Sequence, residues 1–245
     1  MATYRGNDDG NRYNGTSVAD LIYGRSGDDT LSGGGGNDTI DGGEGNDDIR
    51  GGSGNNVIRG GSGNDRIWAG NGSDRISAGE GNDKVSAGAG HNTIALGEGD
   101  DLAVSLMGND SIDTGEGNDS VRSGAGNDRL WGHEGDDVLL AEAGHDRLSG
   151  GEGNDVLNGG LGNDVMAGGE GADRFVFNAG TDRIIDFENG DDEIDLSFFA
   201  QFTGFASIRA AASQSGTDVI IRAGGNALVI QDTRLSQLDG DDFIW

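Results

Sequence analysis

A nine-residue repeat occupies most of this chain and constrains its fold more than any other feature. We call each nine-residue repeat a word and the positions within it its first to ninth letters. If Asp155 is the sixth letter of its word, the repeat runs without a gap from residue 6 to residue 185. Of the 20 sixth letters between positions 11 and 182, 17 are Asp, and the others are Asn11, Asn56 and Asn92. A period this strict is typical of a stacked repeat architecture and not of a globular core.

The remaining letters of the word follow the same register. The fourth letter is Gly in every word from Gly27 to Gly180, and the eighth is apolar from Tyr13 to Ile184, with an undersized Ala103. We expect each word to bury one side chain, that of its eighth letter. Gly and Asn indicate turns with left-handed or unusual dihedrals. We interpret the fifth-letter asparagines in this way: Asn37, Asn46, Asn55, Asn64 and Asn82.

Composition excludes an ordinary globular domain. The 245 residues include 50 Gly and no Pro, and the formal net charge is −28. Such charge and low hydrophobicity favour disorder, whereas a regular period requires order. Burial of one apolar side chain per word stabilises too little to offset the ordering of the backbone of a whole word. We therefore expect the chain to be unfolded at neutral pH unless it binds a metal.

The word GGxGxDxUx, clearest in residues 150–176, resembles the nonapeptide of the RTX proteins that Gram-negative bacteria export by type I secretion. The resemblance covers residues 6–185. It implies an all-β fold, namely a right-handed parallel β-roll in which six residues form a turn and three form a short strand. Alternate words would stack in alternate sheets. We interpret the looser pattern of residues 96–113, which contains Ala103 and Leu106, as drift in a tolerant array.

The resemblance also implies calcium between turns that lie two words apart on one edge of the roll. Calcium takes about six to eight oxygen ligands, which carboxylates and main-chain carbonyls supply. Carried onto one site, the pattern has Gly34, Gly36 and Asp38 facing Gly51 and Ser53, with Asn56 as a poorer partner than Asp. We expect roughly 10 to 16 ions in the array.

The implied carboxylate ligands are the sixth letters Asp20, Asp29, Asp38, Asp47, Asp65, Asp74, Asp83, Asp101, Asp110, Asp119, Asp128, Asp137, Asp146, Asp155, Asp164, Asp173 and Asp182. The implied carbonyl ligands are those of Gly34, Gly36, Gly43, Gly45, Gly52, Gly54, Gly61, Gly63, Gly151, Gly153, Gly160 and Gly162. Because the same Asp rows repel one another without metal, the pattern predicts that calcium binding and folding are coupled.

The two ends of the chain differ from the array. Residues 1–23 resemble degenerate opening words, and we expect them to be a frayed end of the stack. Residues 24–185 form the predicted roll, and 186–245 form a predicted cap and secretion module. Residues 219–221 and 228–230 are predicted strands joined by a turn at 223–226. A helix is predicted with an apolar face formed by Phe198, Phe199, Phe202, Phe205 and Ile208.

The segment that follows the array carries a second resemblance. The pattern RFVF…DRIIDFENGDDEIDLS is similar to the segment that closes the roll in serralysin-type proteases and mannuronan epimerases, and the ending DDFIW resembles their export signals. Residues 1–23 lack the apolar run of a signal peptide, and no stretch approaches the length of a membrane span. We therefore expect secretion through type I machinery to an extracellular location.

Other chemistry finds little support in the sequence. His133 and Glu134 begin like a zincin HExxH motif, but position 137 is Asp. His91 and His145 are fifth-letter residues, and the register does not bring them to His133. The absence of Cys excludes thiol catalysis and disulfides. The net charge makes a nucleic-acid surface improbable. Trp68 and Trp131 are interpreted as solitary exposed aromatics and not as a sugar platform.

These observations predict a non-enzymatic, secreted calcium-binding protein. One alternative is a calcium-stiffened adhesion module that binds polysaccharide or a cell surface, and another is the carrier part of an RTX effector. An ice-binding solenoid would need flat ladders of Thr. The seventh letters of alternate words instead are Thr30, Asp48, Arg66, Lys84 and Leu102, which disfavours that function.

Overall fold

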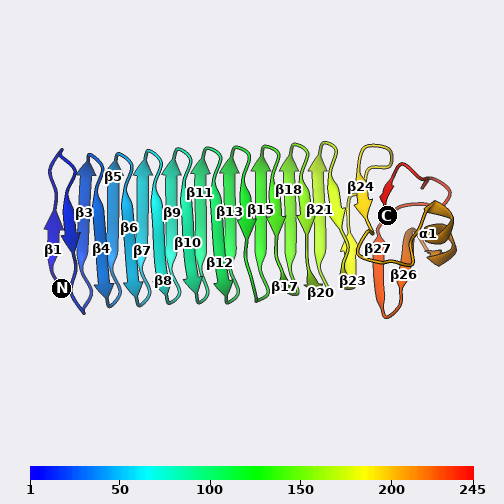
Figure 1. Ribbon diagram of the computed structural model, residues 1–245, viewed down its shortest axis with the longest axis horizontal. Coiled ribbons are helices and arrows are strands. Elements are labelled where there is room, and N and C mark those ends of the chain that lie inside the picture. Colours follow the sequence, from blue (N-terminus) through cyan, green and yellow to red (C-terminus); the bar gives the residue numbers. More distant parts are fainter.

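The structure, a computed structural model that describes residues 1–245, is a straight rod of stacked strands with a small cap at its C-terminal end (Figure 1). Two sheets run along the rod. The 16-stranded sheet contains, in spatial order, β1 (Thr3–Arg5), β3 (Leu21–Ser26), β5 (Thr39–Glu44), β7 (Val57–Ser62), β9 (Arg75–Glu80), β11 (Thr93–Glu98), β13 (Ser111–Glu116), β15 (Arg129–Glu134), β18 (Arg147–Glu152), β21 (Val165–Glu170), β23 (Ala179–Ile184), β27 (Asn226–Ile230), β26 (Asp218–Ala223) and β25 (Ala212–Ser215), and it includes the short strands β17 (Ala143–Gly144) and β20 (Leu161–Gly162).

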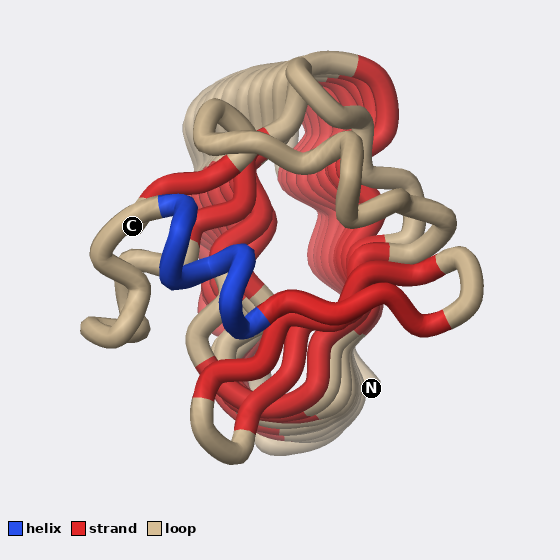
Figure 2. Tube along the Cα trace, turned by 90° about the vertical axis from the view of Figure 1, so that its right-hand side faces the viewer, coloured by secondary structure: helices blue, strands red, loops and turns tan.

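The 12-stranded sheet faces it across the core. Its strands, in order, are β2 (Arg12–Asn14), β4 (Thr30–Gly35), β6 (Asp48–Ser53), β8 (Arg66–Asn71), β10 (Lys84–Ala89), β12 (Leu102–Met107), β14 (Ser120–Arg122), β16 (Val138–Leu140), β19 (Val156–Asn158), β22 (Arg174–Val176), β24 (Glu193–Asp195) and β28 (Phe243–Ile244). The end view shows the two sheets facing each other and the turns stacked along two opposite edges (Figure 2).

The pairing register confirms that alternate words stack in alternate sheets. Within the repeat, each strand pairs in parallel with the strand two words away, as in Leu31 with Ile49 and Ile49 with Ile67. Most strands have six residues and not three, because the first to third letters of each word also join the ladder. The predicted parallel β-roll is therefore confirmed, with longer strands than expected.

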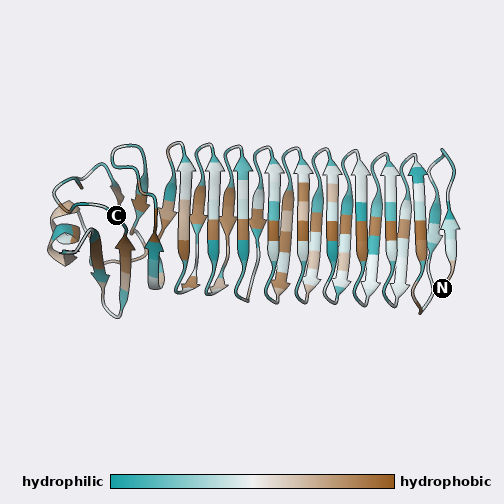
Figure 3. Cartoon of the chain, turned by 180° about the vertical axis from the view of Figure 1, so that it is seen from behind, coloured by the Kyte–Doolittle hydropathy of each residue, from teal (hydrophilic) through white to brown (hydrophobic).

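The core contains two inward letters per word, so the expectation of one was wrong. In β8, Ile67 (eighth letter) and Ala69 (first letter) are both buried, because alternate residues of a strand share one face. Buried first letters elsewhere include Leu96 and Phe177. The eighth-letter residues form the apolar band at mid-strand in Figure 3. One contiguous cluster of 36 buried apolar residues runs from the array into the cap.

The looser segment 96–113 stays within the stack. The first-letter Leu96 and the undersized eighth-letter Ala103 belong to one word, and both are buried in the core. Near Ser105 and Met107 the pairing of β12 with β10 shifts register. Leu106 replaces the usual second-letter Gly, and its side chain is exposed.

The N-terminal words belong to the stack in full register. Strand β1 pairs with β3 through Thr3 and Leu21, and β2 pairs with β4 through Arg12 and Thr30. The rings of Tyr4 and Tyr13, which occupy eighth-letter positions on the two sheets, stack with centroids 4.2 Å apart and cover the open end of the core. The expectation of a frayed end was therefore wrong, because two aromatic rings close it.

The cap contains the predicted hairpin. Strands β26 and β27 are antiparallel and turn at Gly224, and β27 continues the 16-stranded sheet by pairing in parallel with β23. Strand β28 extends the 12-stranded sheet beside β24. The ladders of the array thus pass directly into the C-terminal segment.

The predicted helix was partly wrong. Helix α1 (Phe205–Ala211) starts only after Gly204, and it buries Ile208. The residues before it form tight turns in which Phe199 N–H bonds to Leu196 O and Phe202 N–H bonds to Phe199 O. Phe198 is exposed. Helix α1 is too short to cross a bilayer, and no other helix has the length and apolar character to do so.

Candidate metal centre

The turns depend on glycine at their second and fourth letters. Gly34 and Gly36 have φ of 94° and 102°, a region that L side chains rarely adopt. A Cβ on Gly52 would also collide with the carbonyl oxygen of Gly34 on the neighbouring rung. Every glycine predicted as a carbonyl ligand has positive φ: Gly34, Gly36, Gly43, Gly45, Gly52, Gly54, Gly61, Gly63, Gly151, Gly153, Gly160 and Gly162.

The sixth-letter aspartates form two buried rows, one along each edge. All 17 are buried, and each accepts at Oδ1 the main-chain N–H of the residue at the same letter two words earlier. For example, Asp101 N–H donates to Asp119 at 2.7 Å, and Asp119 N–H donates to Asp137 at 2.8 Å. The two-word spacing of the predicted ligands is therefore present.

We name the two edges by their sixth letters. The interrupted edge contains Asp20, Asp38, Asn56, Asp74, Asn92, Asp110, Asp128, Asp146, Asp164 and Asp182. All but the last directly precede a strand of the 16-stranded sheet, and Asp182 lies within β23. The continuous edge contains Asp29, Asp47, Asp65, Asp83, Asp101, Asp119, Asp137, Asp155 and Asp173, and Asp192 follows as a tenth carboxylate.

The second oxygen of these carboxylates has no partner in most words. Oδ2 is buried without a hydrogen-bond donor in Asp29, Asp38, Asp47, Asp65, Asp74, Asp83, Asp101, Asp119, Asp128, Asp137, Asp146, Asp155, Asp164, Asp173 and Asp182. Buried polar atoms are otherwise almost always satisfied. A row of orphaned anionic oxygens at two-word spacing is what a set of hard divalent cations would satisfy, so the residues present fit calcium.

A main-chain carbonyl converges on the orphaned oxygen. Asp38 Oδ2 and the carbonyl oxygen of Gly51, the first letter two words later, both lie against the Cα of Gly33, where a Cβ would meet them. The same arrangement recurs at Gly42 with Asp47 and the Gly60 carbonyl. Two acceptors that face each other without a donor repel, so a proton or a cation between turns would stabilise them.

In the words whose sixth letter is Asn, the side-chain amide supplies a hydrogen-bond donor that an aspartate carboxylate cannot supply. Asn56 Nδ2 donates to the carbonyl oxygens of Gly54 at 3.1 Å and Ala69 at 3.4 Å. Ala69 stands to Asn56 as Gly51 stands to Asp38, since each is the first letter two words later. The Asn56 amide therefore donates to the carbonyl at the position that, in the aspartate words, faces an orphaned carboxylate oxygen.

Burial disfavours the charged form of the sixth-letter carboxylates. Burial, with a smaller contribution from neighbouring aspartates, raises the pKa of Asp47, Asp83 and Asp101 to about 7. The pKa is also raised to about 7 in Asp137, Asp146 and Asp182, and to about 6 in Asp65, Asp155, Asp173 and Asp192. Without a cation, ionised rows at neutral pH therefore oppose folding.

The predicted ligands of one site are brought together only in part. Asp38 and the carbonyl of Gly51 converge, but the carbonyl oxygen of Ser53 accepts the N–H of Gly36 at 2.9 Å. No group of three or more His, Cys, Asp or Glu side chains converges to hold a metal. Any cation in these turns must therefore take main-chain carbonyls in addition to carboxylates.

The fifth-letter asparagines have a different role from the one expected. None has positive φ. Their Oδ1 atoms instead accept the main-chain N–H of the residue two words later, as from Asn55 to Asn37 at 2.9 Å and from Asn64 to Asn46 at 2.9 Å. His91 takes the same place, since its Nδ1 accepts the N–H of Asn109 at 2.7 Å. The predicted dihedral role was wrong, because a side-chain acceptor ladder explains these residues.

Asp192 was missed because the period ends before it. It is buried, and its Oδ1 accepts the N–H of Asp173 at 3.0 Å, although one extra residue separates them compared with two words. Its Oδ2 accepts the N–H of Glu188. The sequence EID directly after Asp192 retains the polar–apolar alternation of the array, which is the signal that a one-residue insertion concealed.

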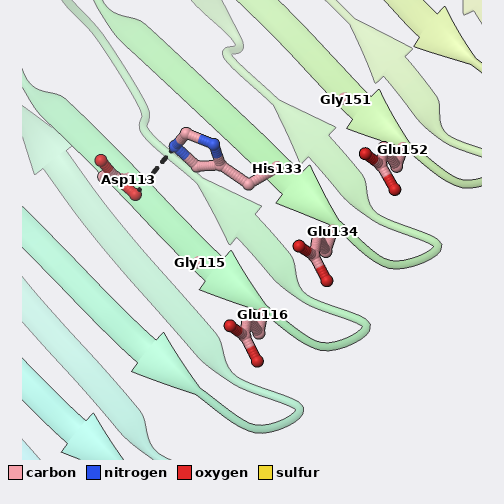
Figure 4. Close-up of a pocket in the computed structure, with 7 residues that line it drawn as sticks. All are labelled: Asp113, Gly115, Glu116, His133, Glu134, Gly151 and Glu152. Carbon is pink, nitrogen blue, oxygen red and sulfur yellow. Dashed lines mark ion pairs between the residues drawn. The ribbon is translucent and has the colours of Figure 1, made fainter.

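An exposed glutamate ladder accompanies the continuous edge. The third letters Glu80, Glu98, Glu116, Glu134, Glu152 and Glu170 pair in register on successive strands. Three of them lie side by side in Figure 4, beside an ion pair in which His133 Nε2 lies 3.1 Å from Asp113 Oδ1. The continuous edge therefore carries more acidic groups than the interrupted edge, whose third letters include Ala89, Met107 and Leu161.

The histidines and tryptophans behave largely as expected. His133 is a second-letter residue with φ of 72°, and it meets neither His91 nor His145 in a common site. Trp68 is half-exposed and lies under the Arg50 guanidinium of the neighbouring strand, 4.8 Å from the ring centroid. It is therefore packed against a cation rather than solitary.

Three solved structures are similar to this chain. An extracellular lipase from Serratia marcescens matches at 19% identity and a TM-score of 0.32, over 82% of this chain and 40% of the lipase. A subunit of a mannuronan C5-epimerase from Azotobacter vinelandii matches at 25% and 0.33, over 57% and 78%. A Ca²⁺-dependent β-helical antifreeze protein from an Antarctic bacterium matches at 23% and 0.43, over 82% and 85%.

The chain thus spans less than half the length of the lipase. No curated protein matches the sequence. The family model of the RTX calcium-binding nonapeptide repeat matches residues 5–40, 14–49, 41–76, 68–103, 105–139, 113–148, 131–166, 140–175 and 149–184. These matches cover residues 5–184 except position 104, which is most of the chain. The chain therefore belongs to the family of RTX calcium-binding nonapeptide repeat proteins.

Proposed function

We propose that this chain is a secreted, non-enzymatic protein whose roll folds when calcium fills its turns. The observation that supports it is the pair of buried Asp rows with orphaned Oδ2 atoms. Each calcium ion would be held by carboxylates two words apart together with first-letter carbonyls such as that of Gly51. The ions would cancel much of the net charge of −28.

The same rows give calcium control over folding. Without metal, ionisation of buried carboxylates and their mutual repulsion favour the unfolded chain at neutral pH. With metal, the binding free energy becomes folding free energy. Low calcium inside a cell would thus keep the chain extended for passage through a type I channel, and external calcium would fold it.

We further propose that residues 186–245 act as the cap and export module. Strand β27 continues the 16-stranded sheet and is followed there by β26 and β25, while β28 is the last strand of the 12-stranded sheet, so the cap shields the end of the core. The non-enzymatic role is supported by the histidines, since Nδ1 of His91 and of His145 accepts a main-chain N–H in the fifth-letter ladder. These nitrogens are engaged in holding the stack.

The direct test is circular dichroism of the purified chain in chelator and in calcium at neutral pH. Calcium should convert a disordered spectrum into a β spectrum, and calorimetry should record binding of several ions together with folding. Magnesium is the matched control, because it is smaller and gives up its water reluctantly. A β spectrum in excess chelator at neutral pH, unchanged by calcium, would contradict the proposal.

A further inference from the structure

We propose that calcium loads the two edges unequally, filling the continuous edge and leaving gaps in the interrupted edge where a built-in donor replaces the ion. This inference rests on the proposed function. The continuous edge contains two such donors, Thr114 and the amide of Asn11, which lies at its N-terminal end ahead of the first Asp pair. The donors on the interrupted edge are the amides of Asn56 and Asn92 and the hydroxyls of Thr16, Ser105 and Ser123.

Ser105 is the clearest case. It is a first-letter residue, and the first letter of each word lies against the orphaned carboxylate oxygen where the ion would bind. Ser105 Oγ donates to Asp110 Oδ2 at 2.6 Å, so this carboxylate, unlike its neighbours, has both oxygens bonded. Asn92 Nδ2 lies 3.3 Å from Ser105 Oγ and 3.2 Å from the carbonyl of Gly90. The three side chains form a closed, buried network that leaves no oxygen for a cation.

Thr114 and Ser123 are the first letters of the next two words. Their hydroxyl groups donate to a main-chain carbonyl and not to a carboxylate. Thr114 Oγ1 donates to the carbonyl of Gly132 at 2.5 Å, and Ser123 Oγ donates to that of Ala141 at 3.2 Å. Each of these carbonyls belongs to the first letter two words later. In the ordinary words, that carbonyl faces an orphaned carboxylate oxygen, so each hydroxyl occupies an oxygen that a cation would need.

The N-terminal end of the interrupted edge also has a donor. Thr16 Oγ1 donates to Asp20 Oδ2 at 2.8 Å, and the Thr16 N–H donates to the same oxygen at 2.6 Å. Asp20 therefore has both oxygens bonded, because its Oδ1 accepts the N–H of Ala2.

The arrangement divides the possible sites by edge. On the continuous edge, eight neighbouring Asp pairs lack an inserted donor: 29–47, 47–65, 65–83, 83–101, 101–119, 137–155, 155–173 and 173–192. On the interrupted edge only two remain: 146–164 and 164–182. The expected loading is about ten ions, with an ion-free stretch on the interrupted edge from its N-terminal end to Asp146.

The test is calcium stoichiometry by calorimetry, with ions located by anomalous scattering in a crystal grown in calcium. Asn56→Asp should add about two ions, because its carboxylate would be shared by two neighbouring turns. The combined variant Ser105→Gly, Thr114→Gly and Ser123→Gly should add about three, because it restores the glycine walls of the ordinary words.

Matched controls separate site formation from charge and flexibility. Asn55→Asp adds the same charge one position away, at an exposed fifth letter, and should add no ion. Ser86→Gly makes the same truncation at an outward-facing ninth letter and should also leave the count unchanged. The crystal of the unaltered chain provides a readout that requires no variant to fold.

The outcomes distinguish the two proposals. A chain that binds no calcium overturns the proposed function. A chain that binds calcium at the turns of Asn56, Asn92, Asp110 and Asp128 as fully as elsewhere overturns only the unequal loading. Unchanged counts in folded Asn56→Asp and in the triple variant would also overturn it.

Discussion

Acidification without calcium should fold this chain. Burial raises the pKa of ten carboxylates from 3.8 to about 6 or about 7 in the folded state. Because these folded-state pKa values exceed the unfolded value, the folded chain binds protons that the unfolded chain releases. The stabilisation is complete below about pH 4 and is lost as the pH rises through 6 to 7.

The size of the effect follows from the number of protons. Each such carboxylate changes the free energy of unfolding by about 1.4 kcal/mol per pH unit between its unfolded and folded pKa values. Ten carboxylates set an upper limit to the slope on the order of 10 kcal/mol per pH unit. Because neighbouring aspartates in a row interact, their protons bind over a wider pH range than independent groups would show. A proton on Oδ2 turns this orphaned acceptor into a donor toward the facing carbonyl, as the amide is in Asn56.

The assay is a pH titration in excess chelator, from about pH 8 to about pH 5, followed by circular dichroism and by proton uptake. The lower limit stays above the sequence pI of about 4.1 to preserve solubility. β-Structure should appear as the pH falls below about 7, and calcium should bind more weakly there, because it must displace protons. The reasoning fails if the chelated chain remains disordered at pH 5 although calcium folds it at neutral pH.

Three further predictions test the geometry. Asp83→Ala should cost about two calcium ions, since the turns toward Asp65 and toward Asp101 both share its carboxylate and neither contains an inserted donor. Val85→Ala, in the same word, should cost about 1 to 3 kcal/mol of unfolding free energy and no ion, because its buried side chain belongs to the core. Calorimetry and thermal melts would compare the two variants, and the reverse pattern would contradict the two-word geometry. Gly52→Ala places a Cβ against the Gly34 carbonyl at a φ of 101° and should lower stability by more than about 1 kcal/mol, measured by denaturant titration in calcium. Deletion from Ser197 onward removes β27 and β28, so it should preserve calcium binding, reduce unfolding cooperativity and abolish secretion through a type I system; undiminished export would refute the export role.

The sequence predicts a structural feature where one position of the repeat is nearly always filled by residues that have a single structural role. Asp at nearly every sixth letter identified the buried rows, and apolar eighth letters identified one half of the core. Strand pairing over two words followed from the family resemblance. The hairpin at Gly224 was predictable because turn residues separate two β-branched runs.

The sequence does not predict a feature where the residue type at that position is compatible with more than one structural role. The inward first letter is often Gly, which carries no apolar signal, and it is apolar in only a few words, as at Ala69, Leu96 and Phe177. Asn suits an unusual dihedral as well as a side-chain acceptor, so the fifth-letter ladder was indistinguishable from turn propensity. The helix was predicted too long because the spacing of apolar residues does not register the break at Gly204.

The alternation of words between two sheets also restricts how the gene for such a rod can change in length. Loss of two consecutive words removes one strand from each sheet and leaves every later word on its own edge. Loss of a single word would leave the pairing of β23 with β27 intact, because both strands follow the deletion, but it would stack every earlier word on the opposite edge relative to the later ones. An odd change therefore joins one part of the interrupted edge to the continuous edge, whereas an even change leaves each edge with its own set of carboxylates.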